Sequence, residues 1–426
     1  MQAACLRTLT IVAVALAVVA AIAAPAGAAG GKLDRNFSRD GRATAFPKGA
    51  TAFGVALDAK GRILVAGYTL DNDTDFALAR FRSNGTLDRG FGGGDGRVST
   101  DLGGNDFGLD IAIASGGRIV VVGERDRRSG ASMAVAVYGP RGVLDRDFSK
   151  DGIAFVRYGK EFQGANAVAV GASEKILIAG STSNGATSRW ALARLRPDGS
   201  RDRRFGGDGR VTVDLASNDE QVNDVTIVDG GRIVAVGSAE SGSSPRIAIA
   251  RFKIGGKLDR SFGKRGVKLT DVANGADTAY GVAEQANGKL IVVGHAANGG
   301  KADWSVLRYG DNGRLDDTFH DDGARILAFG SDYEFAQAAA VQPNGRIVVV
   351  GRIRRSQNDQ FGIVRLKPNG TYDRNFSKDG RVVVDFDGGV DTARDVTLQR
   401  NGKIVVAGEA FAFGRRRLAV ARLHAS

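Results

Sequence analysis

Clustered arginines are the residues in this sequence whose type and spacing first suggest chemistry. A guanidinium group binds carboxylate, sulfate or phosphate through two parallel hydrogen bonds, and three short polar segments carry several arginines each. The clusters are Arg125, Arg127 and Arg128; Arg352, Arg354 and Arg355; and Arg415, Arg416 and Arg417. They predict a site for an anionic polymer. The alternative is that they are solvated loop tips of a protein with a formal net charge of +12.

Acidic residues recur at a second position, just before the first apolar segment of each repeat described below. They are Asp106, Glu220, Asp277, Glu334 and Asp391, with Gln163 and Ala50 at the two remaining places. A ring of such acids at the mouth of a channel would gather cations, and whether a metal binds there stays open. The alternative is that each carboxylate accepts hydrogen bonds from the backbone of its own loop.

Other residues with possible chemistry form weaker patterns. Asp71-x-Asp73-x-Asp75 resembles the start of an EF-hand loop, but Phe76 stands where that loop requires glycine. The histidines, His295, His320 and His424, lie in different repeats, so they assemble neither a zinc site nor a Ser-His-Asp triad. We therefore assign no catalytic residue and expect no cofactor.

A repeated turn positions all of these residues. Its core, Asp-x-x-Phe, occurs seven times, with a first step of 54 residues and later steps of 57. The copies are Asp34/Phe37, Asp88/Phe91, Asp145/Phe148, Asp202/Phe205, Asp259/Phe262, Asp316/Phe319 and Asp373/Phe376. A fixed period of this length is typical of repeat architectures in which each unit is one supersecondary module.

Each repeat contains four short apolar or β-branched segments separated by Gly, Asn-Gly and Asp-Gly turns, as at Asn344-Gly345. This pattern predicts an antiparallel four-stranded meander. Seven such sheets predict an all-β, seven-bladed β-propeller rather than an open solenoid. The chain begins with a turn and a strand (42–46) that its last repeat lacks, so we expect the N-terminal strand to complete the last blade.

The two faces of such a propeller differ. The first-to-second and third-to-fourth strand turns are repetitive and form what we call the uniform face. The other loops differ from blade to blade and form the varied face, where we expect any partner to bind. An arginine also recurs before six of the seven turns, and we expect each to pair with the turn aspartate that follows it, Arg422 with Asp34. Val137 takes the place of this arginine before Asp145.

The recurring Asp-Gly-Lys-Ile-Val-Val-Gly-like hairpin, Ala-Arg-Leu strand and Asn-Gly-x-Leu-Asp-x-x-Phe-Gly turn resemble the delta-60 repeat family of exported bacterial proteins. The resemblance covers residues 31–426, with Arg201 and Tyr372 in place of the turn leucine. It implies a β-propeller and export, and it brings no catalytic residue.

The amino-terminal segment indicates export independently. Arg7 precedes an apolar run from Ile11 to Ala24, and Ala26-Gly-Ala28 follows as a small-residue cleavage site. We therefore predict a secretory signal over residues 1–28 and one propeller over residues 29–426, a secreted monomer without a membrane span. The single cysteine, Cys5, lies in the signal, so the exported protein would have no disulfide.

These observations predict an exported, non-catalytic binding or scaffolding protein for an anionic envelope polymer or a protein partner, with a nucleic acid disfavoured. The alternative is a hydrolase or lyase that acts on a lactone or glycan at the channel mouth, with or without a cation. The fold by itself does not choose between them.

Overall fold

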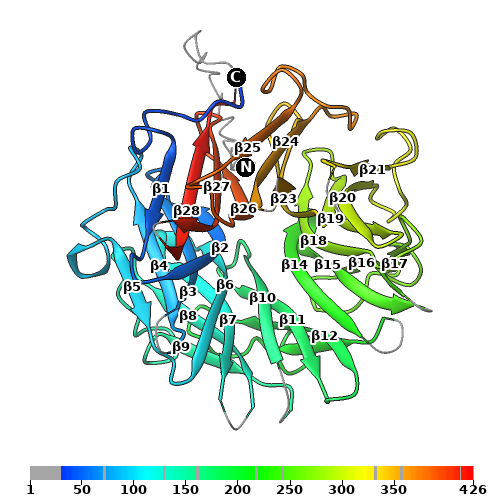
Figure 1. Ribbon diagram of the computed structural model, residues 1–426. Helices are drawn as coiled ribbons and strands as arrows, with labels where there is room; N and C mark the ends of the chain where they lie inside the picture. The colour runs from blue at the N-terminus through cyan, green and yellow to red at the C-terminus, as the bar shows by residue number, and fades with distance from the viewer. Residues whose placement is uncertain are drawn as a thin grey trace, which may run out of the picture.

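Four-stranded antiparallel sheets repeat around a central axis, and each is built from one sequence repeat (Figure 1). The computed structural model describes residues 30–70, 73–127, 130–159, 163–215, 219–241, 244–330, 333–355, 358–412 and 414–425. The predicted signal segment, Asp71 and Arg128 lie outside these residues. Seven sheets of four strands confirm the predicted propeller.

The innermost strands are β2 (Ala50–Leu57), β6 (Asn105–Ile113), β10 (Gln163–Val170), β14 (Glu220–Val228), β18 (Thr278–Glu284), β22 (Phe335–Val341) and β26 (Thr392–Leu398). The second strands are β3 (Ile63–Thr69), β7 (Ile119–Asp126), β11 (Ile176–Ser183), β15 (Arg232–Ser241), β19 (Leu290–Asn298), β23 (Ile347–Arg355) and β27 (Ile404–Ala412). Both sets are antiparallel neighbours within their sheets.

The third strands are β4 (Phe76–Phe81), β8 (Ser132–Tyr138), β12 (Ser188–Leu195), β16 (Ser244–Phe252), β20 (Lys301–Tyr309), β24 (Asn358–Leu366) and β28 (Arg415–Leu423). The outer strands are β5 (Arg97–Thr100), β9 (Ile153–Val156), β13 (Arg210–Val213), β17 (Val267–Thr270), β21 (Ala324–Leu327), β25 (Arg381–Val384) and β1 (Arg42–Ala45). The helical elements of the described residues are three short 3-10 turns, η1 (Gly92–Gly94), η2 (Ser115–Gly117) and η3 (Asp229–Gly231).

The N-terminal strand closes the ring, as predicted. β1 pairs antiparallel with β28 from Arg42↔Ala421 to Ala45↔Leu418 and is the outer strand of the last blade. Figure 1 shows the blue strand β1 beside the red strand β28. Because β1 covers the outer edge of β28, that edge is not left unpaired in the seventh blade.

The core lies between the blades. The second and third strands are apolar on both faces, and β4 and β8 are buried throughout. Each apolar cluster takes side chains from two neighbouring sheets, for example Val122 and Val135 of one blade with Ile178 and Ala193 of the next. The turn phenylalanines are at most 1% exposed, so each fills the base of a blade junction as expected.

Candidate functional site

The repeated arginines hold the uniform face together. The predicted Arg–Asp pairs all form, and the Arg Nε to Asp Oδ2 distances are 2.9 Å (Arg80–Asp88), 2.8 Å (Arg194–Asp202), 2.9 Å (Arg251–Asp259), 2.6 Å (Arg308–Asp316), 2.9 Å (Arg365–Asp373) and 2.8 Å (Arg422–Asp34). Each guanidinium also lies over the phenylalanine of the same turn, with its carbon 4.5 to 4.9 Å from the ring centroid. It donates as well to a backbone carbonyl of the next blade, as Arg251 does to Asp311 at 2.6 Å.

A second cation, which we did not predict, reaches six of the turn aspartates from the start of the second strand. The pairs are Arg62–Asp88 (3.0 Å), Arg118–Asp145 (2.7 Å), Lys175–Asp202 (2.9 Å), Lys289–Asp316 (2.6 Å), Arg346–Asp373 (2.7 Å) and Lys403–Asp34 (2.6 Å). Asp145 lacks the strand arginine, as Val137 predicted, and Arg118 supplies its cation instead. The turn aspartates of the uniform face and their basic partners therefore have a structural role.

The acids predicted at the channel mouth are buried, between 0 and 1% exposed, at or near the start of the innermost strands. Each accepts a backbone N–H from the loop that precedes it: Leu102 to Asp106 (2.6 Å), Leu215 to Glu220 (2.6 Å), Val272 to Asp277 (2.6 Å), Phe329 to Glu334 (2.8 Å) and Phe386 to Asp391 (2.8 Å). Gln163 accepts the Tyr158 N–H in the same way (2.7 Å). This geometry corresponds to the loop-backbone alternative.

Most of the clustered arginines lie in the strands that flank the loops between second and third strands: Arg125 in β7, Arg352, Arg354 and Arg355 in β23, and Arg415, Arg416 and Arg417 in β28. Several already have partners in the chain. Arg127 donates to the Gly103 carbonyl at 2.5 Å, Arg354 pairs with Asp359 at 3.0 Å, and Arg416 lies 3.6 Å from Glu409. Arg415 donates to the Lys48 carbonyl at 3.1 Å. Arg355 and Arg417 are exposed and partly buried, respectively, while Arg128 lies outside the described residues.

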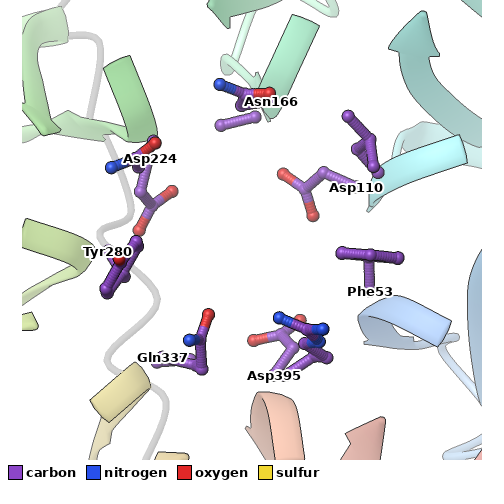
Figure 2. A pocket seen from close by; sticks show the side chains of 12 residues that line it. Phe53, Asp110, Asn166, Asp224, Tyr280, Gln337 and Asp395 are labelled. Carbon is purple, nitrogen blue, oxygen red and sulfur yellow. The ribbon is translucent and has the colours of Figure 1, made fainter. Parts of the chain in front are cut away.

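The central channel is the cavity that all seven innermost strands share. Every innermost strand contains a β-bulge at the same phase, for example between Ala165 and Ala167 of β10. The bulged residues are Phe53, Leu109, Asn166, Asn223, Tyr280, Gln337 and Arg394, and all seven line one cavity of about 210 Å³. Figure 2 shows labelled side chains of this set arranged around one open space. A bulge re-aims a side chain, and here seven bulges aim seven different side chains at the channel.

Aspartates beside three of the bulges join neighbouring blades. The carboxyl group of each accepts two backbone hydrogen bonds: that of Asp224, for example, accepts the N–H of Val225 (2.7 Å) and the N–H of Val282 in the next blade (2.8 Å). Asp110 and Asp395 repeat this pattern. Burial raises the pKa of Asp224 to about 7 and that of Asp395 to about 6, although the backbone hydrogen bonds oppose the shift. Burial and the charges of the other two raise the pKa of Asp110 well above its usual range.

A second ring of dissimilar residues lies nearer the varied face, directly after the glycine inside each second strand. Its members are Tyr68, Glu124, Ser181, Ser238, His295, Arg352 and Glu409. Aromatic and charged side chains gather on one side of it. His295 stacks on Tyr280 (5.6 Å between ring centroids) and meets Phe335 edge-on (4.8 Å), and Arg352 lies 4.6 Å above the Phe335 ring.

Two arginines face the cleft on this side. Tyr280, Phe335, Gln337, Arg352, Thr392 and Arg394 line it. Arg352 pairs with Asp359 at 3.3 Å and Arg394 with Glu409 at 2.8 Å. The Nε of each is buried without a hydrogen-bond partner in the part of the chain that the structure describes. Burial lowers the pKa of Arg352; Asp359 opposes this shift, and the charges of Arg354 and Arg394 add to it.

We did not predict the two channel rings from the sequence, although a signal for them is present. The recurring glycine of the second strand faces the bulge, and a Cβ on Gly67 would lie 1.8 Å from the Thr51 carbonyl oxygen. Glycine inside a strand often marks a bulge or a close backbone approach. The side chains next to that glycine and opposite it are therefore candidates for the channel wall, and they are where the repeats differ most in chemistry.

Comparison with known proteins identifies similar repeats. Six segments match the profile of the family described as "Domain of unknown function (DUF5122) beta-propeller": residues 61–91, 173–205, 231–262, 285–319, 342–376 and 399–426. The corresponding part of the copy that carries Val137 is not among them. The match agrees with a β-propeller repeat family. No curated protein matches the chain in sequence.

Solved structures share the fold at low sequence identity. Virginiamycin B lyase from Staphylococcus aureus, in a catalytically inactive form with quinupristin, is 10% identical with a TM-score of 0.53, covering 89% of this chain and 97% of the lyase. A streptogramin B lyase is 11% identical with a TM-score of 0.53, covering 89% and 96%. The polysaccharide lyase Uly1 is 10% identical with a TM-score of 0.50, covering 89% and 90%. At such identities the likeness shows the propeller fold alone.

No helix of the described residues is long and apolar enough to cross a membrane.

Proposed function

We propose that the protein is an exported, non-catalytic binding protein that holds an anionic saccharide at the channel mouth on the varied face. The export part of this proposal rests on the amino-terminal sequence, with its short apolar run and small-residue cleavage site. The binding part rests on the bulged residues of the channel and on the cleft that contains Arg352. Seven repeats that agree in strands and turns differ where their side chains meet in one cavity.

The observation that carries the proposal is the pair of buried, unpartnered Nε donors of Arg352 and Arg394 beside one cleft. An unsatisfied buried donor is costly, and a carboxylate or sulfate would satisfy it with charge-assisted hydrogen bonds. Tyr280 and Phe335 line the same cleft and offer apolar surface for the face of a sugar ring. The cleft thus suits a ligand with an anionic group and a ring.

The deeper channel favours hydroxyl groups over a second anion. Asn166, Asn223 and Gln337 offer amide donors and acceptors there, and the carboxyl groups of Asp110, Asp224 and Asp395 lie in the same wall. The oxygens of these acids would accept hydrogen bonds from sugar hydroxyls, and those acids that are ionised would repel an anion. We expect the anionic group of the ligand to stay at the mouth.

The clustered arginines extend the site outward. Arg354 and Arg355 end the strand that carries Arg352, and Arg415, Arg416 and Arg417 begin the third strand of the next blade. A polymer with a charge on each sugar would reach from the cleft to these arginines, while Arg127 lies on a more distant blade. A protein partner with an acidic segment is the other ligand that these loops would accept.

The enzymatic alternative receives less support from the geometry. The acids on which it relies are buried and bound to backbone amides. Burial lowers the pKa of His295 to about 4, so its imidazole is neutral, and it lies behind Tyr280 and Phe335. A catalytic acid or base must reach the reacting atoms within hydrogen-bond distance.

Calorimetric titration with oligogalacturonate, its methyl ester, dextran sulfate and dextran tests the proposal. We expect the acidic ligands to bind, the neutral ones not to bind, and affinity to fall with added salt. The double variant Arg352→Gln/Arg394→Gln should bind at least about tenfold more weakly, as the loss of one to two charge-assisted hydrogen bonds implies. Arg203→Gln, an exposed arginine of a uniform-face turn, is the matched control.

The triple variant Arg415→Ala/Arg416→Ala/Arg417→Ala separates the cleft from the outer loops. If the cleft holds the anion, this variant should lose part of the salt dependence and keep most of the affinity for short ligands. Affinity lost in the triple variant alone would place the site on the loops. Binding to none of the acidic ligands would contradict the proposal, and the appearance of new reducing ends or unsaturated sugars would favour the enzymatic alternative.

A further inference from the structure

Three aspartates meet at the junction of the first two blades, on the varied face and away from the channel cleft. Asp75 precedes β4 in one blade, while Asp101 and Asp106 lie on the segment that leads from β5 into the next blade. One carboxylate oxygen of each lies within 4.8 Å of an oxygen of the other two. Asp106 is fully buried, Asp75 is partly buried, and Asp101 is exposed. The group is therefore closed on the protein side and open to solvent on the other.

The buried member has an oxygen that the protein leaves unsatisfied. Asp106 Oδ2 accepts the Leu102 N–H at 2.6 Å, whereas Oδ1 is buried and has no hydrogen-bond partner among the described residues. The equivalent Asp277 and Asp391 each use both oxygens. Asp277 Oδ1 accepts the Ala297 N–H at 3.2 Å, and Asp391 Oδ1 accepts the Phe411 N–H at 3.1 Å. An unpaired buried carboxylate oxygen is costly, so something else should bind it.

The same two positions carry an ion pair at other blade junctions. Arg189, at the place of Asp75, lies 3.5 Å from Asp214, at the place of Asp101. Arg246 and Asp271 repeat this pair at 3.5 Å. At the first junction Asp75 stands at this place, so a carboxylate faces a carboxylate where two other blades supply a guanidinium. Like charges this close repel each other unless a cation lies between them.

Within the described residues, Asp106 has no ion-pair partner. Arg125 lies opposite Asp106 in the neighbouring strand, but its Nη1 donates to the Leu102 carbonyl (3.4 Å) and its guanidinium stacks 3.5 Å above the Phe155 ring. Ser99 donates its hydroxyl to Asp75 Oδ2 at 3.0 Å, and the Gly103 N–H donates to Asp101 Oδ1 at 2.5 Å. The hydroxyl of Thr74 is buried without a partner in the described part of the chain and is one more available oxygen.

We propose that Asp75, Asp101 and Asp106 bind a divalent cation with a preference for Ca²⁺. Hard cations take carboxylate, hydroxyl and water oxygens, and Ca²⁺ tolerates the irregular geometry of ligands drawn from two separate segments. Water would complete the coordination on the open side next to Asp101. The ion would fasten the loop before β4 to the segment before β6, as the Arg–Asp pairs do at other junctions.

This site differs from the EF-hand suggested by Asp71-x-Asp73-x-Asp75. Phe76 is the first residue of β4 and is fully buried, so the chain enters the sheet where an EF-hand loop would continue. Of the described residues of that pattern, Asp73 and Asp75, Asp75 joins the cluster, and its two partners are Asp101, directly after β5, and Asp106 of β6.

Calorimetric titration of the purified, chelator-treated protein with CaCl₂ and MgCl₂ tests the proposal, with thermal unfolding in excess Ca²⁺ or excess chelator as a second measurement. We expect one Ca²⁺ per chain, weaker Mg²⁺ binding, and a higher unfolding temperature with Ca²⁺, because a ligand that binds the native state stabilises it. Asp75→Asn and Asp101→Asn should each weaken Ca²⁺ binding at least about tenfold. Asp214→Asn, at the place of Asp101 in a blade that carries an arginine, is the matched control and should bind Ca²⁺ as the unmodified protein does.

The variant Asp75→Arg tests the site by a replacement of the cation as well as by a loss of Ca²⁺ binding. It restores the residue type of Arg189 and Arg246, so it should fold, bind no Ca²⁺, and unfold at the same temperature with or without chelator. Failure of the unmodified protein to bind Ca²⁺, an Asp75→Asn variant that binds it unchanged, or preferential binding of Mg²⁺ would each overturn the proposal. Saccharide binding in the channel is measured separately, so neither result depends on the other.

Discussion

Each turn aspartate of the uniform face is surrounded by groups that favour its charged form. Asp202, for example, is buried and meets Arg194 at 2.8 Å and Lys175 at 2.9 Å, and it accepts the Arg204 N–H at 3.3 Å. Burial alone would raise the pKa of such carboxyl groups. The cations and amides outweigh it and lower the pKa of Asp34, Asp88, Asp202, Asp259 and Asp316. Because these pKa values fall below those of the unfolded chain, the stability they provide is present above about pH 4 and is lost as the pH falls further.

The number of cations at each turn predicts which substitution matters. Asp145 faces Arg118 and no strand arginine, whereas Asp88 keeps Arg80 and Arg82 when Arg62 is removed. We expect Arg118→Gln to lower the free energy of unfolding by about 1–3 kcal/mol, since it leaves a largely buried carboxylate without its cation. Arg62→Gln should cost less than about 1 kcal/mol. Urea denaturation of both variants at neutral pH measures this difference, and equal losses would contradict it.

Of the two basic side chains that pair with each turn aspartate, the sequence allowed one, the strand arginine, to be predicted. The strand arginine and the turn aspartate keep a constant spacing, and adjacent positions of one hairpin must be close. The residue after the hairpin glycine, such as Arg118 or Lys289, reaches the turn aspartate across the third strand. That contact depends on the twist of the sheet and on side-chain length, which a repeat pattern does not contain.

At the scale of the strands, the β-bulge is the feature that directs a polar or apolar side chain from each innermost strand into the channel. It places an extra residue in every innermost strand, and the aspartate that follows three of these bulges binds the next blade, as Asp224 binds Val282. The second strand accommodates the bulge through a glycine such as Gly237, whose Cβ would lie 1.8 Å from the Gln221 carbonyl oxygen. The strands themselves follow from the apolar segments and turns. The bulges arise where seven strands converge on one axis, and only the glycine records them in the sequence.

The pH dependence of stability should reveal these bridging aspartates. Burial raises the pKa of Asp224 to about 7, above the value of the unfolded chain, despite the hydrogen bonds from Val282 and Val225. The folded state then holds more protons than the unfolded state between about pH 4 and pH 7, so this carboxyl group makes the protein less stable as the pH rises through that range. Water in the channel weakens the effect, and we expect about 1 kcal/mol.

The comparison of Asp224→Asn with the unmodified protein isolates this contribution. Since asparagine does not titrate, the stability of the unmodified protein relative to the variant should increase by about 1 kcal/mol when the pH is lowered from 8 to 5. Asp321→Asn, an exposed aspartate of a uniform-face turn, should show no such change. Urea denaturation at four pH values measures both differences. A relative stability that stays constant, or that falls as the pH is lowered, would mean that Asp224 is ionised throughout.

At the scale of the whole molecule, closure joins the two ends of the described chain into one turn. Leu33 bridges Leu423, Asp34 pairs with Arg422 at 2.7 Å, and Phe37 is fully buried. The His424 N–H donates to the Lys32 carbonyl at 2.9 Å, as the Lys367 N–H donates to Thr371 at 2.8 Å in the preceding blade. The sequence sufficed to predict this closure, because the last repeat lacks the turn and the outer strand that the first segment supplies.

A circular permutation tests whether this closure is equivalent to the turn of any other blade, interrupted only by the two chain termini. A chain that runs from Pro47 to Ser426 and continues directly with Gly31 to Phe46 places Lys32 four residues after His424, the spacing of Lys367 and Thr371. We expect this chain to be a monomer with a free energy of unfolding within about 2 kcal/mol of the original order, because every pair of the seventh blade is kept and one loop is exchanged for another of similar length. Residues 47–426 alone should instead associate or unfold, since β28 loses its partner and the Arg422 guanidinium loses Asp34. Circular dichroism and size-exclusion chromatography with light scattering distinguish these states. A truncated chain as stable and monomeric as the permuted one would mean that β1 covers the ring without closing it.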